Sequence, residues 1–90
     1  MPKQIKAIFY GRVQGIGFRY TALKIARELG LQGFAKNLAD GSVQLVAQGE
    51  EESINNFVLE IKKSFSNEIE KVETIWQKPT STFRDFQIKF

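Results

Sequence analysis

The sequence predicts an α+β fold, a split β-α-β sandwich in which two helices cover one face of an antiparallel sheet. The hydrophobic pattern changes its period along the chain in the order β-α-β-β-α-β and ends with one further C-terminal strand. The strand patterns alternate apolar with polar residues, whereas fully buried parallel strands are continuous apolar runs. Each helical pattern carries one apolar stripe, which is typical of a helix that packs against a sheet through one side.

Length and composition predict one soluble domain that spans residues 1–90. The 90 residues are 42% hydrophobic and 26% charged, which is ordinary for a globular protein and leaves no room for a second domain. The chain has no Cys and no His, so disulfides, thiolate nucleophiles, imidazole bases and nearly all structural zinc sites are excluded. The formal net charge of +3 suits an anionic substrate but is weak support for nucleic acid binding.

A strand, a glycine-rich loop and a helix are expected first. Ile5, Ala7 and Phe9 alternate along the chain and predict a strand of about six residues. Three glycines at positions 11–17 then interrupt the pattern. The helix that follows is expected to end at Gly30, because glycine is favoured just past a helix C-terminus. Its apolar stripe consists of Phe18, Ala22, Ile25, Ala26 and Leu29.

A hairpin is expected after the first helix. Its first strand is predicted at residues 31–38. Asp40 and Gly41 are expected to supply the positive φ angles of a tight turn. The second strand of the hairpin ends at Gly49 and has one apolar face, formed by Val43, Leu45 and Ala47.

The second half of the chain predicts a helix and two strands. Acidic residues 50–52 precede the helix and Lys62 and Lys63 stand near its end, an arrangement that the helix dipole favours. The apolar stripe of this helix is Ile54, Phe57, Val58, Ile61 and Phe65. Strands are predicted at Ile69–Gln77 and at residues 86–90, with a turn at Pro79, Thr80 and Ser81 between them. Trp76 and the eight Phe are predicted to be core residues.

The glycine-rich loop is the main candidate binding site. Its glycines let the backbone curl until successive N–H groups face one point, which makes a nest for an anion. The orphan N–H groups and the positive dipole end of the next helix favour an anion at the same place. Arg19, in the first helical turn, can direct its guanidinium to that anion. The glycine spacing fits neither the dinucleotide pattern nor the Walker pattern, so a phosphate site and a plain tight turn both stay open on the glycines alone.

Two longer strings carry a resemblance to a known family. GRVQGIGFR at residues 11–19 resembles the signature of the acylphosphatase family, and GFAKNLADGSV at residues 33–43 resembles its second signature at the expected separation. The likeness extends over essentially the whole chain, although Lys89 and Phe90 stand where Arg and Tyr are frequent. The resemblance implies a ferredoxin-like fold and the hydrolysis of acyl phosphates to a carboxylate and inorganic phosphate, without metal or cofactor.

The resemblance also implies roles for individual residues. Arg19 becomes the phosphate-binding arginine and Asn37 the residue that orients the attacking water. The backbone N–H groups expected to hold the phosphoryl oxygens are those of Gln14, Gly15, Ile16, Gly17 and Phe18. The chemistry is compatible with a chain that lacks His, since the leaving carboxylate has a pKa near 4 and needs no general acid. Arg12 is either a second phosphate contact or a solvated loop charge.

Other functions stay open at this point. The alternative is a non-catalytic ferredoxin-like module that binds a phosphorylated ligand or RNA; residues 17–20 resemble part of an RNA-recognition motif but lie at a loop and helix start. A regulatory fragment of a larger maturation protein is a third hypothesis, which the absence of a linker weakens. No signal peptide or membrane span is predicted. We therefore expect a cytoplasmic monomer that acts on a small-molecule acyl phosphate and binds neither nucleic acid nor membranes.

Overall fold

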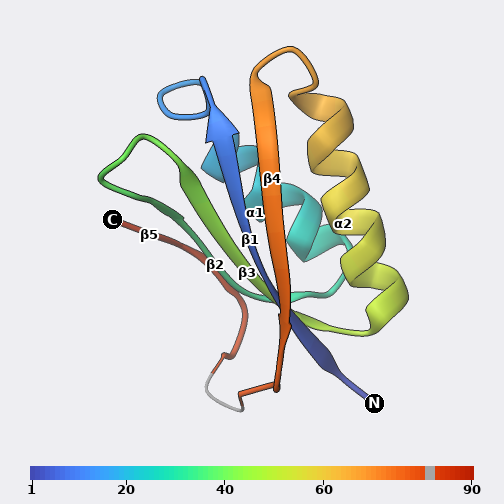
Figure 1. Ribbon diagram of the computed structural model, residues 1–90. Helices are drawn as coiled ribbons and strands as arrows, with labels where there is room; N and C mark the ends of the chain where they lie inside the picture. Colours follow the sequence, from blue (N-terminus) through green and yellow to red (C-terminus); the bar gives the residue numbers. More distant parts are fainter. Residues whose placement is uncertain (81–82) are drawn as a thin grey trace.

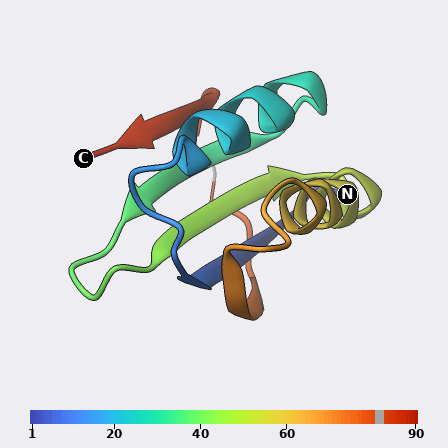
Figure 2. The same ribbon diagram turned by 90° about the horizontal axis from the view of Figure 1, so that it is seen from above.

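Five strands and two helices form two layers (Figure 1). The computed structural model describes residues 1–80 and 83–90. The elements are β1 (Lys3–Gly11), α1 (Phe18–Glu28), β2 (Gln32–Asn37), β3 (Val43–Gly49), α2 (Glu51–Ser64), β4 (Ile69–Gln77) and β5 (Phe86–Lys89). Both helices lie on the same side of the sheet when the molecule is seen from above (Figure 2). The predicted α+β class and split β-α-β order are confirmed.

The sheet is mixed, with the strand order β4-β1-β3-β2-β5. β1 pairs antiparallel with β3 and β4, and β2 pairs antiparallel with β3, as expected. β5, however, pairs in parallel with β2, so the prediction of an antiparallel sheet is wrong for the last strand. The reason is that β4 and β5 occupy opposite edges. The chain crosses between them at the end where β4 finishes and β2 begins, so β5 runs in the direction of β2.

The core lies between the sheet and the helices. One face of β1 contributes Ile5, Ala7 and Phe9, which meet the apolar stripes of α1 and α2. Full burial of an Ile or Phe side chain stabilises a fold by about 1.5–3 kcal/mol. The ring of Phe18, the first residue of α1, has its centroid 5.2 Å from that of Phe9 and 4.7 Å from that of Phe65. The core therefore fixes the start of α1, where the glycine-rich loop ends.

The helix ends follow the predicted signals. Gly30 has a φ of 70°, and its N–H donates to the Arg27 carbonyl at 3.2 Å while the Leu31 N–H donates to the Ala26 carbonyl at 2.8 Å. These two bonds form a Schellman motif, which satisfies carbonyls that would otherwise lack donors. α2 begins after Glu50, with two acidic residues in its first turn and two lysines in its last, the charge arrangement that a helix dipole favours.

The connection between β2 and β3 differs from the predicted tight turn. It contains residues 38–42, and Gly41 has a positive φ of 93° whereas Asp40 does not. The Asp40 carboxylate instead accepts hydrogen bonds from the Ser42 amide, at 2.9 Å, and from the Ser42 hydroxyl. In this turn the Asp40 carboxylate takes the place of a backbone carbonyl as the hydrogen-bond acceptor. Asp40 therefore keeps a negative φ.

Not every aromatic side chain lies in the core. Five of the eight Phe are buried, but Phe90 is 94% exposed and Trp76 is 47% exposed. The prediction that Trp76 and all Phe belong to the core is therefore wrong for these two, and also for Phe34 and Phe83, which lie outside the core cluster. Phe34 and Phe83 are half-buried and pack on each other, with ring centroids 6.1 Å apart. Trp76 lies near the end of the edge strand β4, whose Ile69 and Val72 pack against the core. α2 packs mainly over β1 and β3, which leaves the Trp76 end of β4 exposed.

The sheet face opposite the helices is held at one end by glutamines and carries both signs of charge. Gln4 donates to Gln77 at 2.9 Å and accepts from the Thr80 amide at 3.0 Å, which fixes the start of the crossing segment. The predicted turn at Pro79, Thr80 and Ser81 falls partly outside the described residues, at Ser81.

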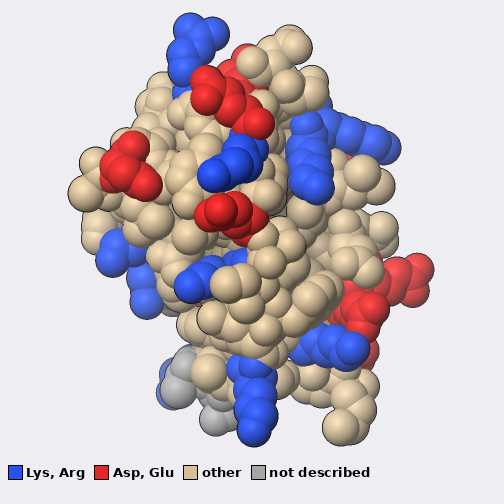
Figure 3. All heavy atoms as spheres, viewed as in Figure 1, with Lys and Arg blue, Asp and Glu red and all other residues tan. Residues whose placement is uncertain are grey.

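Figure 3 shows Lys and Arg side chains lying beside Asp and Glu side chains on the sheet face opposite the helices. No patch of a single sign covers the part shown there.

Candidate active site

The loop between β1 and α1 is attached to neighbouring segments on two sides. The Arg12 amide donates to the Glu68 carbonyl at 3.0 Å. On the other side, the Gln14 side-chain amide donates to the carbonyls of Leu38, at 2.8 Å, and Ser42, at 3.0 Å. The loop is therefore fixed to the α2–β4 connection and to the β2–β3 connection at once, and its curl does not depend on the glycines alone.

The curled loop presents N–H groups without backbone partners. Gly15 and Gly17 have φ angles of 77° and 81°, in the left-handed region that favours glycine. Within residues 1–80 and 83–90, none of the N–H groups of residues 14–18 donates to a backbone carbonyl. Gly17 is the N-cap of α1, and neither a capping side chain nor an acidic residue stands in the first turn. The positive end of the helix dipole therefore faces the loop uncompensated, which favours an anion.

Arg19, in the first turn of α1, reaches the end of β5. Its Nη1 donates to the Lys89 carbonyl at 3.4 Å, and its guanidinium carbon lies 5.1 Å from the centroid of the Phe90 ring. No carboxylate in the described part of the chain forms an ion pair with it. Because a guanidinium carries five N–H donors, Arg19 retains donors for an external anion.

Asn37, the last residue of β2, has a side-chain oxygen without a partner. Asn37 lies on the helix side of the sheet, because Ala35 on the same face is in the core and Lys36 is exposed on the other. Its Oδ1 is buried, and no donor from the described residues bonds to it. A buried acceptor left unsatisfied costs about 1–3 kcal/mol. A water molecule held by this oxygen would remove that cost.

The topology brings the loop, Arg19 and Asn37 to the same end of the sheet. β1 and β2 both pair antiparallel with β3, so they run in the same direction and finish at the same end. β5 is parallel to β2 and sets Lys89 opposite Lys36, the residue before Asn37. Arg19 contacts the Lys89 carbonyl. The site residues predicted from separate stretches of sequence therefore converge and are not scattered over the fold.

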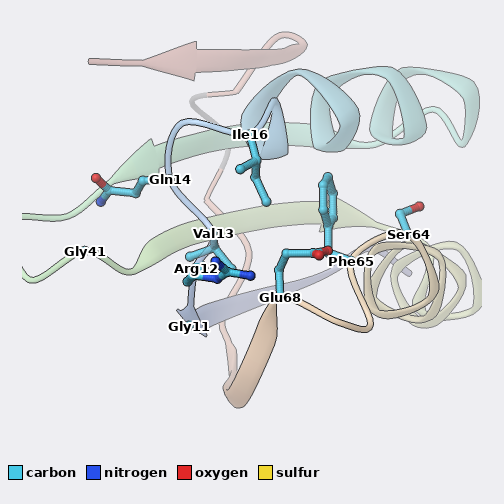
Figure 4. Close-up of a pocket in the computed structure, with 9 residues that line it drawn as sticks. All are labelled: Gly11, Arg12, Val13, Gln14, Ile16, Gly41, Ser64, Phe65 and Glu68. Carbon is cyan, nitrogen blue, oxygen red and sulfur yellow. The ribbon is translucent and has the colours of Figure 1, made fainter.

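A cavity of about 600 Å³ opens beside the loop. Its lining residues are Gly11, Arg12, Val13, Gln14, Ile16, Gly41, Ser64, Phe65 and Glu68. Figure 4 shows the side chains of Arg12, Ile16 and Glu68 pointing into this space. Gln14 and Gly41 extend the lining to the β2–β3 connection, but Arg19 and Asn37 do not line the cavity.

The side-chain pKa values that are shifted all move away from neutrality. Hydrogen bonds from Ser42 lower the pKa of the Asp40 carboxyl. A hydrogen bond of 2.8 Å from the Tyr10 hydroxyl lowers the pKa of Glu73 and raises the pKa of Tyr10. No shift thus creates an acid or base tuned to neutral pH, and the site offers hydrogen-bond donors and one amide acceptor.

Over residues 1–80 and 83–90, no three acidic side chains gather in the way that a metal ion requires. Neither helix, in that same part of the chain, is long and apolar enough to cross a membrane.

Comparison with known proteins assigns the chain to a family. The acylphosphatase family model matches residues 5–88. The chain belongs to the acylphosphatase family. An acylphosphatase of Caldanaerobacter subterraneus subsp. tengcongensis is 39% identical over 89 residues, which are 98% of this chain and 99% of that protein. One of Thermoplasma volcanium is 43% identical over 81 residues, 90% of each chain. The crystal structure of the Bacillus subtilis acylphosphatase matches with a TM-score of 0.90 at 33% identity, over the whole of both chains.

The acylphosphatase assignment confirms the implied fold and makes the chain a hydrolase that acts on acyl phosphates. Two contacts of this acylphosphatase site were not predicted from the sequence. Gln14 was expected to contribute only its backbone N–H, but its side chain also holds the β2–β3 connection. Arg19 was expected to face only phosphate, but it also contacts Phe90. No local pattern reports contacts between residues so far apart in the chain.

Proposed function

We propose that the loop N–H groups of Gln14, Gly15, Ile16, Gly17 and Phe18 hold the phosphoryl group of an acyl phosphate. Arg19 binds the same group through its guanidinium, and Asn37 orients the attacking water. The observation that carries the proposal is the buried Oδ1 of Asn37, which has no donor from the described residues and stands at the sheet end where the loop lies. A carboxamide oxygen can accept a hydrogen bond from water and fix its position.

The proposed reaction is one in-line displacement at phosphorus. The water oxygen forms a bond to phosphorus, and the bond from phosphorus to the acyl oxygen breaks, so the electron pair leaves with the carboxylate. Charge develops on the equatorial phosphoryl oxygens, where the loop N–H groups and Arg19 stabilise it. One proton of the water passes to a phosphate oxygen of the substrate. The products are a carboxylate and dihydrogen phosphate, which balances atoms and charge.

This route needs neither a general acid nor a general base from the protein. A carboxylate with a pKa near 4 leaves without being protonated. Alkyl phosphate esters are expected to be poor substrates, because an alkoxide leaving group requires a proton or a metal. We propose that no metal or cofactor takes part.

We further propose that residues 1–90 act as one cytoplasmic domain and as a monomer. One core cluster joins both helices to the sheet, which supports a single domain. The absence of Cys is compatible with a reducing compartment. The partner we propose is a small-molecule acyl phosphate, with no binding to membranes.

Binding of nucleic acid is not part of the proposal. In a ferredoxin-like module that binds RNA, aromatic side chains on the exposed sheet face stack with the bases. The central strand β3 presents Gln44, Val46 and Gln48 on the face opposite the helices. Phe34 of β2 shares that face, but its ring packs on Phe83. The mixed charges of that face (Figure 3) also weigh against a phosphate backbone as ligand.

The test is phosphate release from benzoyl phosphate, with and without a chelator, by the unaltered chain and by Asn37→Ala. We expect the unaltered chain to be equally active with the chelator. Asn37→Ala should lose most of kcat and keep its inhibition constant for inorganic phosphate, since placing water and binding the anion are separate tasks. A fall in phosphate affinity without a fall in kcat would reverse the assigned role.

Lys36→Ala provides the matched control. Lys36 is the neighbour of Asn37 on the same strand but is exposed on the other face of the sheet. We expect it to leave both kcat and phosphate inhibition within about twofold of the unaltered chain. An equal loss in the two variants would indicate damage to β2 and not the removal of a water-orienting group.

A further inference from the structure

A groove runs between α2 and the edge strand β4, which lie alongside each other (Figure 1). Two cavities of about 510 and 390 Å³ share Trp76 in their linings, and the second shares Lys62 with a third cavity of about 360 Å³. The three cavities therefore adjoin one another along β4. We propose that this groove binds an extended, acidic segment of a partner protein, which joins the sheet as a strand beside β4.

β4 offers a free backbone edge along the groove. The strand stands at one end of the order β4-β1-β3-β2-β5 and pairs only with β1. In the part of the chain that the structure describes, the backbone groups of residues 70–77 have no backbone partner outside β1. Such an edge can accept an extended peptide through main-chain hydrogen bonds, and pockets beside the edge then select its side chains.

Trp76 and Leu59 form the apolar centre of the groove. Both line its middle cavity, and they are 47% and 49% exposed. Trp76 lies on the helix side of β4, because it stands opposite the core residue Ile5 of β1. Alternate side chains of an added strand would point to the same side. An apolar side chain there would cover the indole and the leucine, and this burial favours binding.

The charges along the groove favour an acidic occupant. Its lining includes four lysines and two glutamates, which are Lys3, Lys62, Lys71, Lys78, Glu51 and Glu70. Lys3 and Lys71 form ion pairs with glutamates, at 2.6 and 3.5 Å. Lys62 and Lys78 pair with no carboxylate of the described residues. Two lysines are thus available to carboxylates of a bound segment.

The positions of these two lysines define the pattern of the bound segment. Lys78 follows Trp76 on β4, whereas Lys62 lies beside the preceding part of the strand, between residues 69 and 74. An occupant with one apolar residue between two acidic residues on its helix side would match both lysines and the apolar centre. A second copy of the chain fits less well, because two grooves that each carry an excess of lysine would repel each other.

The experiment uses the fluorescence of Trp76, which is the only Trp of the chain and therefore reports on the groove. The probe is a short, terminally blocked peptide in which one leucine has a glutamate two residues away on each side, with threonine at all other positions. We expect it to shift the Trp76 emission to shorter wavelength until the signal saturates, and to slow amide hydrogen exchange in β4. A peptide with lysine in place of glutamate should cause neither change.

Lys62→Glu and Lys78→Glu test the two lysines. Because exposed ion pairs are worth up to about fivefold in affinity, we expect the Kd of the acidic peptide to rise about fivefold in each variant. Lys63→Glu is the matched control, since Lys63 is the exposed neighbour of Lys62 and lines none of the three cavities. Its Kd should stay within about twofold of that of the unaltered chain.

Three results would overturn the proposal: the acidic peptide leaves the emission unchanged, both peptides bind alike, or Lys63→Glu weakens binding as much as the groove variants. An emission that shifts with the concentration of the chain alone would assign the groove to a second copy, and would overturn it as well. None of these substitutions alters a residue proposed for catalysis, so the proposed function does not depend on the outcome.

Discussion

Arg19 holds its position through two contacts with the last residues of the chain, and neither contact uses all of its donors. We predict that Arg19→Ala lowers kcat/KM for acetyl phosphate by about 10²–10³, which corresponds to the roughly 3–4 kcal/mol lost when one preorganised donor is removed. Its free energy of unfolding should change by less than about 1 kcal/mol, because Phe90 is exposed. Steady-state kinetics and denaturant titration measure the two quantities.

Arg27→Ala is a close control on the same helix. Arg27 also donates to a carbonyl of β5, that of Phe86, at 3.4 Å, but it lies two turns further along α1, away from the loop. We expect its activity to be unchanged. If Arg19→Ala turned over substrate normally, or if both variants lost activity alike, Arg19 would not be the phosphate-binding residue.

The identities of the candidate residues could be predicted from sequence, whereas their contacts could not. Arg19 and Asn37 stand in two strings whose residue types and spacing are specific. The unsatisfied Oδ1 of Asn37 depends on which groups surround it after folding. The same holds for the side-chain bonds of Gln14 to Leu38 and Ser42, since only the folded chain brings these residues together.

At the scale of the element, the loop combines an exposed tip with a backbone conformation that favours glycine. Gly17 has a φ of 81°, and an added Cβ would meet no atom within 4 Å. We therefore predict that Gly17→Ala costs about 1 kcal/mol of unfolding free energy through backbone strain alone. Because the same strain disfavours the conformation in which the loop N–H groups share one direction, we expect kcat/KM to fall by about tenfold or more.

Gly30→Ala is the control that separates the loss of stability from the loss of activity expected for Gly17→Ala. Gly30 has a similar φ of 70° and equally open surroundings, but it caps the other end of α1. Its loss of stability should match that of Gly17→Ala while kcat/KM stays unchanged. Equal activity in the two variants would mean that the loop conformation does not contribute to catalysis.

Element order could be predicted from periodicity, but three properties of the elements could not. The direction of β5 depends on which sheet edge the crossing chain reaches. The exposure of Trp76 depends on how far α2 extends over β4. The turn at Asp40 is made by its carboxylate, which replaces the expected positive φ. The first two depend on tertiary contacts and the third on a local side-chain bond between Asp40 and Ser42, and none of them alters the alternation of hydrophobic residues.

For the whole molecule, we predict a flat dependence of kcat on pH from about 6 to 8. The chain has no His and no Cys. The pKa values of Asp40 and Glu73 are lowered and that of Tyr10 is raised, so each of these groups keeps its charge state throughout this interval. The profile should be measured with acetyl phosphate at constant ionic strength. A bell-shaped curve centred near pH 7 would contradict the absence of a protein acid or base.

The two ends of the chain lie at opposite ends of the sheet. β1 starts far from the loop, whereas Lys89 and Phe90 contact Arg19 (Figure 1). A purification tag, fusion partner or surface linker attached at Met1 would therefore extend into solvent away from the reacting group. The same addition after Phe90 would begin beside the guanidinium, so engineered versions of this enzyme should carry their extensions at the N-terminus.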